Sequence, residues 1–301
     1  MSRASNAHAR MKGPVVPLNV CFNADGTVNY AAVSNYVSWL AEKKTAIVML
    51  TYGSSEFAAL SNEELYELTE VVGAAIKGRS FFIASTKYWK PSETRKFIAH
   101  ANKCGVDAVK VQVDGSIQTT QALPRYFDQI EGVNDMPLLL WTISQPMLPI
   151  ETATELSERP YIIGMKNDAD MFGAYYDYTR NSTGNEFGVI SGGQMRNFAF
   201  GYKFGSPAYL CPIAPFRPAV ALEFYQCLVS GKDNEAWDRV FQFEEPFLQW
   251  AIDKNWLGVM KSAIQLLGFY PNNLLGPPHP PPDPNLLPEV RSKLEQLFPK
   301  P

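Results

Sequence analysis

The sequence predicts a (β/α)8 TIM barrel, an α/β fold, followed by a C-terminal helical extension. Eight short runs of strand-forming residues recur along the first two thirds of the chain, and a stretch with helical character follows each. Alternating strands and helices form parallel sheets with right-handed crossovers, and eight such units close a barrel. An open doubly wound sheet is the alternative, but no glycine-rich dinucleotide loop follows the first run. The predicted strands are 14–18, 46–52, 81–86, 108–113, 137–142, 162–166, 187–191 and 208–211.

Helix start signals lie between several of these runs. Ser61 is followed by two glutamates, an arrangement typical of an N-cap whose first turn carries acids that suit the helix dipole. Pro91 begins a second stretch, in which apolar residues recur at helical spacing. We expect two further helices at 120–130 and 149–156.

The pattern becomes helical throughout beyond residue 216. A proline-rich segment, 276–284, interrupts this tail and is typical of a rigid linker. The first dozen residues are rich in Ser, Ala and Arg, and we expect them to be disordered. The predicted division is therefore a disordered N-terminus at 1–12, a barrel at 13–218 and a C-terminal helical region at 219–301. The helices expected in the tail are 219–230, 235–254, 257–267 and 289–298.

Composition excludes several classes of function. With 301 residues and a net charge of −3, the chain gives no electrostatic reason to bind nucleic acid or acidic membranes. Its four cysteines are dispersed and its three histidines lack metal-ligand spacing, so we expect reduced thiols and no metal site. No apolar run has the length of a membrane span and no secretory signal is evident. The cytoplasm is the expected location.

Lys166 is the candidate catalytic residue. It ends a predicted strand, and the carboxyl ends of barrel strands are where this fold builds its active sites. Burial strips hydration from an ammonium group, lowers its pKa and favours the neutral amine. Such an amine forms Schiff bases with carbonyl substrates. The alternative is a surface lysine just past a strand.

The fourth predicted strand carries polar side chains on one face only. Lys110, Gln112 and Asp114 alternate with valines, and the apolar face of a barrel strand turns outward to the helices. Asp114 would then lie at the mouth of the barrel as an acid–base group. Lys110 is a second candidate for the Schiff-base amine, deeper than Lys166. Alternatively, Lys110 and Asp114 only form polar contacts with each other or with a neighbouring strand.

Four segments, in order along the chain, resemble one family of enzymes. They are Asp25-Gly26, the segment 53–64 with Gly53-Ser54-Ser55-Glu56 before Leu60-Ser61-Asn62-Glu63-Glu64, Gly164-Met165-Lys166-Asn167, and Val189–Gly192. The set resembles the dihydrodipicolinate synthase and N-acetylneuraminate lyase family, which consists of pyruvate-dependent class I aldolases and lyases. The resemblance covers nearly the whole chain.

The resemblance implies roles for particular residues. Lys166 would condense with the keto group of pyruvate or a longer 2-keto acid. The loop with Gly53, Ser54 and Ser55 would hold the substrate carboxylate, and a loop leading into a helix presents unpaired N–H groups to which anions bind. Gly192 would let the substrate approach the backbone closely. The resemblance further implies a homo-oligomer, dimer or tetramer, while the imine itself makes an organic cofactor or metal unnecessary.

The sequence also departs from the family. Gly53 stands in place of the proton-relay threonine, Trp141 in place of the catalytic tyrosine and Gly115 in place of the second relay tyrosine. Pro146 falls where the lysine-pathway enzymes have an arginine. An indole donates a hydrogen bond but cannot shuttle a proton as a phenol does. These departures argue against dihydrodipicolinate synthase itself.

The predicted function is a Schiff-base lyase or aldolase that acts on a 2-keto acid through Lys166. Proton transfer would fall to Asp114, to Tyr52 or to the substrate's own carboxylate. Trp141 and Gln194 are expected to line the pocket. A keto-acid dehydratase of the same family, a catalytically impaired keto-acid-binding relic, and a different chemistry on the same barrel are the alternatives.

Overall fold

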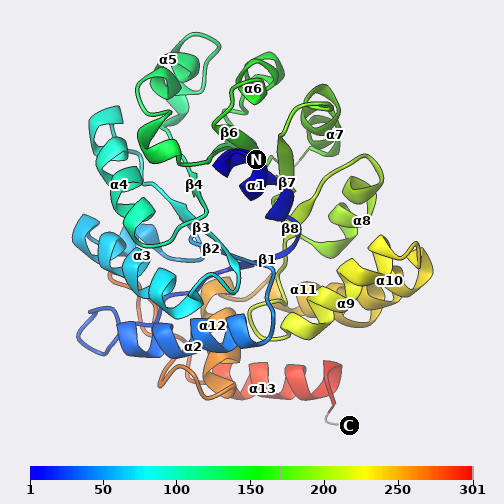
Figure 1. Cartoon of the computed structure of the whole chain (residues 1–301). Coiled ribbons are helices and arrows are strands. Elements are labelled where there is room, and N and C mark those ends of the chain that lie inside the picture. The colour runs from blue at the N-terminus through cyan, green and yellow to red at the C-terminus, as the bar shows by residue number, and fades with distance from the viewer. Residues whose placement is uncertain (170, 300–301) are drawn as a thin grey trace.

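The computed structural model describes residues 1–169 and 171–299, and its centre is a closed barrel of eight parallel strands in the order β1 to β8 (Figure 1). Each strand pairs with its neighbour in sequence, and β8 closes the ring by pairing with β1. The predicted barrel and all eight predicted strands are confirmed, with ends that shift by a few residues. The strands are β1 (Gly13–Pro17), β2 (Ile47–Met49), β3 (Phe81–Ser85), β4 (Ala108–Lys110), β5 (Leu138–Ile143), β6 (Ile162–Asp168), β7 (Gly188–Ser191) and β8 (Ala208–Leu210).

Within the described residues, eight helices surround the strands. Ser61 caps α3 as predicted, because its hydroxyl accepts from the Glu64 N–H while the Glu64 carboxylate accepts from the Ser61 N–H. The eighth helix, α9, contacts β1, so the outer layer of the barrel extends beyond residue 218, where the sequence analysis ended it. The helices are α2 (Tyr30–Glu42), α3 (Asn62–Ile76), α4 (Pro91–Lys103), α5 (Ala122–Asp128), α6 (Ile150–Ser157), α7 (Phe172–Asn181), α8 (Met195–Lys203) and α9 (Pro218–Val229), with 3₁₀ turns at Phe57–Ala59, Gly115–Ile117 and Val133–Asp135.

The strands separate two apolar cores. The larger core lies between the strands and the helices, and the smaller one fills the barrel with side chains such as Val15, Met49 and Ile190. On the fourth strand run, Val109, Val111 and Val113 belong to the outer core, as the alternation predicted. A barrel filled in this way is a packed core rather than a pore, so substrates reach only its ends.

The first residues form a helix, α1 (Arg3–Arg10), and the expectation that residues 1–12 are disordered is wrong. Ala4, Ala7 and Met11 form an apolar stripe that joins the inner core. The Met11 side chain fills space left by the missing side chain of Gly164, whose Cβ would come within 2.8 Å of the Met11 Cε atom. Figure 1 shows α1 across the middle of the ring of strands. It therefore closes the amino end of the barrel, opposite the strand ends that carry Lys166.

The C-terminal region is helical, as predicted, and packs beside α2 and α9 (Figure 1). The single helix expected at 235–254 is interrupted by a π-helical segment, Val240–Glu244. The proline-rich linker follows α12, and Gly276 within it donates its backbone N–H to the Glu56 carboxylate at 2.9 Å. The helices are α10 (Asp233–Arg239), α11 (Glu245–Ala251), α12 (Trp256–Leu266) and α13 (Leu286–Leu297).

Candidate active site

Lys166 lies near the carboxyl end of β6, where Trp141 of β5 and Ile190 of β7 are its partners in register. Its side chain points into the mouth of the barrel and is 6% exposed. The Nζ atom forms an ion pair with Asp168, in contact with both carboxylate oxygens. The amine is buried as expected, and the carboxylate of Asp168 is in contact with it.

Asp168 is the residue that sequence reasoning missed. Side chains alternate along a strand, so Asp168 points to the same side as Lys166, one step closer to the mouth. Trp141 donates its indole N–H to the second carboxylate oxygen of Asp168 at 2.7 Å. The Asp168 side chain is 25% exposed, so its carboxylate contacts an amine and an indole while one side stays open. The alternation of inward and outward side chains, which holds for the fourth strand, also predicts Asp168 on the sixth.

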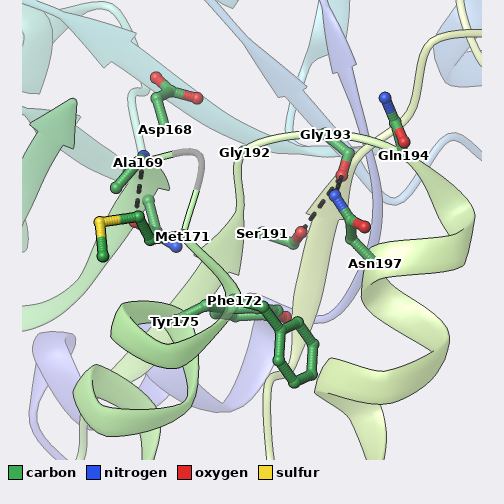
Figure 2. Close-up of a pocket in the computed structure, with 11 residues that line it drawn as sticks. Asp168, Ala169, Met171, Phe172, Tyr175, Ser191, Gly192, Gly193, Gln194 and Asn197 are labelled. Atoms are coloured by element: carbon green, nitrogen blue, oxygen red, sulfur yellow. Dashed lines mark hydrogen bonds between the residues drawn. The ribbon is translucent and has the colours of Figure 1, made fainter. Parts of the chain in front are cut away.

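A pocket of about 260 Å³ opens beside Asp168, between the ends of β6 and β7 and the first turns of α7 and α8. Figure 2 shows Asp168, Ser191, Gln194 and Asn197 around it. Polar residues from two strands and a helix therefore line one space of small-molecule size. Its lining also includes Asn167, Ala169, Met171, Phe172, Tyr175, Gly192 and Gly193.

Gly192 and Gln194 both line this pocket, as expected of substrate-binding residues. A Cβ atom on Gly192 would lie 2.5 Å from an oxygen of Asp168, so the missing side chain makes room for that carboxylate. Gln194 precedes α8 with a φ of 69°, and its side-chain oxygen accepts from the Arg196 guanidinium at 2.5 Å. The missing side chain of Gly192 thus leaves room for the Asn167 carbonyl and the Asp168 carboxylate, and its role in substrate approach stays a prediction.

Lys110 lies deeper in the barrel than Lys166, as predicted, and is 1% exposed. Its Nζ atom donates to the Gln112 side-chain oxygen at 2.8 Å and lies 5.1 Å from the centre of the Trp141 ring. Burial, reinforced by repulsion from Lys166, holds the pKa of Lys110 well below its ordinary value, while Asp168 opposes the shift. Lys110 pairs with Gln112 and not with Asp114.

Asp114 does not face the barrel interior, and this part of the sequence interpretation is wrong. Strand β4 ends at Lys110, after which the chain turns, and Asp114 is fully exposed as the cap of a 3₁₀ turn. Its carboxylate accepts from the Ser116 hydroxyl at 2.6 Å and backbone N–H at 2.9 Å. These hydrogen bonds lower the pKa of Asp114, whereas the acid–base assignment assumed that burial would raise it.

In the loop after β2, more backbone N–H groups are hydrogen-bonded within the loop than expected. The backbone N–H of Ser54 donates to the Thr51 hydroxyl, and those of Ser55 and Glu56 donate to carbonyls of the same loop. The Ser55 hydroxyl is buried and donates to the Leu18 carbonyl at 2.6 Å. The expectation of unpaired N–H groups at Ser54 to Glu56 is therefore wrong, and Ser55 is not free to bind substrate. Gly53 is exposed and has open space over its Cα, and the Ser54 hydroxyl is only partly buried.

A row of aromatic rings runs across the mouth from β5 toward β2. The Trp141 ring lies 6.2 Å from Tyr88, and Tyr88 lies 5.2 Å from Tyr52. Among the residues that the structure describes, Tyr52 has no hydrogen bond or ion pair with Lys166 or Asp168. The structure thus brings Trp141 to the lysine, and leaves Tyr52 two rings away from it.

Residues 10–297 match the Dihydrodipicolinate synthetase family. The chain belongs to this family. It is 24% identical over 275 residues to a DapA-like lyase of uncharacterised function from Thermococcus kodakarensis, an alignment that covers 89% of this chain and 94% of the relative.

Two solved structures show that the fold is shared with family members. A prophage protein of the dihydrodipicolinic acid synthase family from E. coli K12, in complex with pyruvate, superposes with a TM-score of 0.83 at 21% identity, covering 95% of this chain and 98% of the other. A catalytic lysine mutant of the Ruminococcus gnavus sialic acid aldolase superposes with a TM-score of 0.84 at 18% identity, covering 96% of each chain.

Gly115 and Trp141 occupy positions where the family resemblance predicts proton-relay tyrosines. A Cβ atom on Gly115 would lie 2.7 Å from the Pro146 ring, so these two departures from the family pack against each other and leave no room for a tyrosine. Trp141, at the position of the catalytic tyrosine, instead binds the Asp168 carboxylate. In this member of the Dihydrodipicolinate synthetase family, the polar groups beside the lysine are thus a carboxylate and an indole.

In the described part of the chain, no group of three or more His, Cys, Asp or Glu side chains gathers in a way that could hold a metal ion. Among the described helices, none is long and apolar enough to cross a membrane.

Proposed function

We propose that this protein is a Schiff-base-forming lyase or aldolase that acts on a 2-keto acid through Lys166. The observation that carries the proposal is the buried amine of Lys166 at the carboxyl end of β6, in contact with the carboxylate of Asp168, a residue that lines an open pocket. Membership of the Dihydrodipicolinate synthetase family adds support, as do the pyruvate bound to the E. coli K12 structure and the catalytic lysine named for the sialic acid aldolase.

In the proposed chemistry the Lys166 nitrogen attacks the keto carbon, and loss of water leaves an iminium ion. The iminium accepts electrons from the neighbouring carbon–carbon bond. Formation of this covalent intermediate splits one difficult step into two easier ones. Cleavage in one direction yields an aldehyde and pyruvate, and condensation is the reverse. Because the iminium serves as the electron sink, the proposal includes no organic cofactor and no metal.

Borohydride trapping tests the nucleophile. Reduction in the presence of pyruvate should leave one covalent adduct, which peptide mapping should place on Lys166. Lys166→Ala should abolish it, whereas Lys96→Ala, which removes an exposed lysine on α4, should trap as the wild type does. An adduct on Lys110, or no adduct with any 2-keto acid tried, would overturn the proposal.

Product analysis separates the remaining candidates. A lyase releases pyruvate and an aldehyde, and a keto-acid dehydratase releases water without an aldehyde. A keto-acid-binding relic would form the adduct without any turnover. We expect negligible turnover of pyruvate with aspartate semialdehyde, because Gly53, Trp141 and Gly115 replace the expected relay hydroxyls, and single acid–base groups contribute roughly 10²–10⁴ in rate.

We also propose that the protein forms a homo-oligomer, as the family resemblance implied. Exposed aromatic rings connect α7, α8 and α10, which lie side by side in Figure 1. Phe172 lies 5.8 Å from Phe200, which lies 5.4 Å from Trp237, and that ring lies 5.7 Å from Phe241. Large exposed apolar patches mark association surfaces. Phe200→Ser combined with Phe241→Ser should lower the mass measured by sedimentation, and an unchanged mass would exclude this surface.

A further inference from the structure

We propose that Asp168 is the acid–base residue of this site, and that it carries the protons both for the Lys166 amine and for the substrate. The inference rests on the proposed function, since it presupposes an imine on Lys166. It assigns the role that the sequence analysis gave to Asp114 or Tyr52. Trp141 would be the positioning residue that holds the carboxylate.

Three features of the geometry support this assignment. Both Asp168 oxygens contact the Lys166 Nζ atom, which is the atom that must lose protons before and during imine formation. The same side chain is 25% exposed and lines the pocket, so the carboxylate can also reach a bound substrate. Both residues lie on one rigid strand, which fixes their separation.

The protons of imine formation balance with Asp168 as the single acid–base residue. In the resting ion pair Asp168 takes one proton from the Lys166 ammonium, and the freed lone pair attacks the keto carbon. A proton then moves from nitrogen to the former carbonyl oxygen. Asp168 returns its own proton to the resulting hydroxyl, which leaves as water. The products are a protonated imine, one water molecule and an Asp168 carboxylate.

The regenerated carboxylate then serves the carbon–carbon step. It accepts the proton of the substrate hydroxyl at the carbon being released, the carbon–carbon bond breaks, and the electron pair moves to the iminium nitrogen to give an enamine and an aldehyde. Asp168 returns that proton to the terminal carbon of the enamine, which becomes the methyl group of the pyruvate imine. Hydrolysis reverses imine formation and restores the ion pair.

Trp141 suits the positioning role because an indole N–H donates and cannot accept. It therefore keeps its hydrogen bond to the carboxylate after Lys166 has changed from an ammonium to an iminium. The stacking of Lys110 beneath the same ring gives the indole a fixed support. Gly192 leaves the space that this orientation of the carboxylate requires.

The test is solvent deuterium exchange into the methyl group of pyruvate, measured together with the equilibrium amount of borohydride-trapped imine. Asp168→Asn should still trap pyruvate on Lys166, while exchange per trapped imine falls roughly 10²–10⁴-fold, the usual contribution of a positioned acid–base group. Asp168→Glu should recover much of the exchange. Asp177→Asn, which changes an exposed carboxylate on α7, is the matched control and should behave as the wild type.

Each outcome decides between the two proposals. Exchange by Asp168→Asn within about threefold of the wild type, well inside the expected range, would overturn the role of Asp168 and leave Lys166 in place. Loss of trapping in a folded Asp168→Asn protein would make the carboxylate a support for the lysine, and would also overturn the role. Failure of the wild type to trap any 2-keto acid would overturn the proposed function itself. If Asp168→Asn does not fold, Asp168→Glu decides: trapping without exchange would count against the assignment.

Trp141→Phe separates positioning from chemistry. The ring is kept and the hydrogen bond to Asp168 is lost, so trapping should be unchanged while exchange falls about tenfold, as expected for one hydrogen bond to a charged group. Unchanged exchange would show that the indole does not position the carboxylate.

Discussion

Lys166 with Asp168 and Lys261 with Glu56 are two buried lysine–carboxylate pairs with different surroundings. The side chains of Lys261, on α12, and Glu56, after β2, are 1% and 2% exposed, whereas those of Lys166 and Asp168 are 6% and 25% exposed. Lys261 also donates to the Leu274 carbonyl at 2.8 Å, and Glu56 accepts from the linker backbone. The Lys261–Glu56 pair is closed by protein groups, and the Lys166–Asp168 pair is open to a pocket.

The difference in exposure distinguishes a structural ion pair from the pair that we propose to react, although the residue types are the same. In the closed pair, protein groups surround both side chains, and the contact joins the loop after β2 to the C-terminal region. Burial lowers the pKa of Lys261, and Glu56 opposes that shift. In the open pair, the carboxylate keeps a side on which a substrate can bind. The exposure of the two side chains and their other hydrogen-bond partners therefore determine whether a lysine–carboxylate pair can contact a substrate.

Breaking the closed pair should have the largest effect on stability. Lys261→Met leaves Glu56 buried without its cation and should lower the free energy of unfolding by about 3–5 kcal/mol. Lys166→Met should cost at most about 1 kcal/mol, because Asp168 keeps the Trp141 hydrogen bond and reaches water. Urea unfolding measures both variants, and equal losses would contradict the comparison. Imine trapping should show the opposite order of effects. It should be lost completely in Lys166→Met and retained in Lys261→Met.

Glu244 provides a third case, a buried carboxylate held mainly by backbone groups. It accepts from the N–H groups of Met195 and Arg196 at the start of α8, and burial raises its pKa to about 7 from 4.5. Because the folded protein then binds more protons between these values, this residue's contribution to stability should fall as pH rises from 4.5 to 7 and stay constant above. The fall should be about 3 kcal/mol.

The variant Glu244→Gln isolates this contribution. It keeps a side-chain acceptor and removes the titration, so the difference in unfolding free energy between wild type and variant should change over that pH range alone. Urea unfolding at a series of pH values measures it. A difference that does not vary with pH would show that Glu244 keeps an ordinary pKa in the folded protein.

Removing both partners of the closed pair sharpens the comparison further. Glu56→Gln/Lys261→Met keeps an acceptor for the Gly276 N–H and leaves no unpaired charge. The double variant should therefore be about 2 kcal/mol more stable than the sum of the single losses predicts, within the usual range of coupling between contacting residues. Additive losses would show that the two side chains act independently.

Two adjacent serines in the loop after β2 should differ in their effects, and the change at Ser54 should be the smallest. Ser55→Ala removes a buried hydroxyl that donates to the Leu18 carbonyl and accepts from the Thr51 N–H, and it should cost about 1–3 kcal/mol. Ser54→Ala should change stability by less than about 0.5 kcal/mol. If the Ser54 hydroxyl holds the substrate carboxylate, Ser54→Ala should instead raise the KM for the keto acid. An unchanged KM would exclude that role.

The sequence was sufficient to predict the elements that local patterns determine. Alternation and helix signals predicted all eight strands, and the position of Lys166 at a strand end predicted its burial at the mouth. Asp114 was misplaced because alternation holds only while a strand continues, and β4 ends at Lys110. The free N–H groups expected near Ser54 are used by hydrogen bonds within the loop. Neither the strand end nor these turn hydrogen bonds leaves a periodic signal in the sequence.

Contacts between distant segments were not predictable from local patterns. The sequence gives no sign of order at α1, because Ala4, Ala7 and the following Met11 acquire an apolar partner only when the barrel is present. The pairing of Glu56 with Lys261 joins residues on opposite sides of the barrel-to-tail boundary, and no spacing rule connects them. Asp168, in contrast, was within reach of the sequence, since it follows Lys166 at the strand period.

The contact between Glu56 and Lys261 also limits how such proteins can be recombined. A chimera that keeps this barrel but takes its C-terminal segment from a relative would need a cation at the position of Lys261. Without that cation, the Glu56 carboxylate would be buried without a partner charge, in the loop that helps to shape the mouth. Barrel and tail should therefore be exchanged as one unit, because exchanging either alone separates Glu56 from Lys261.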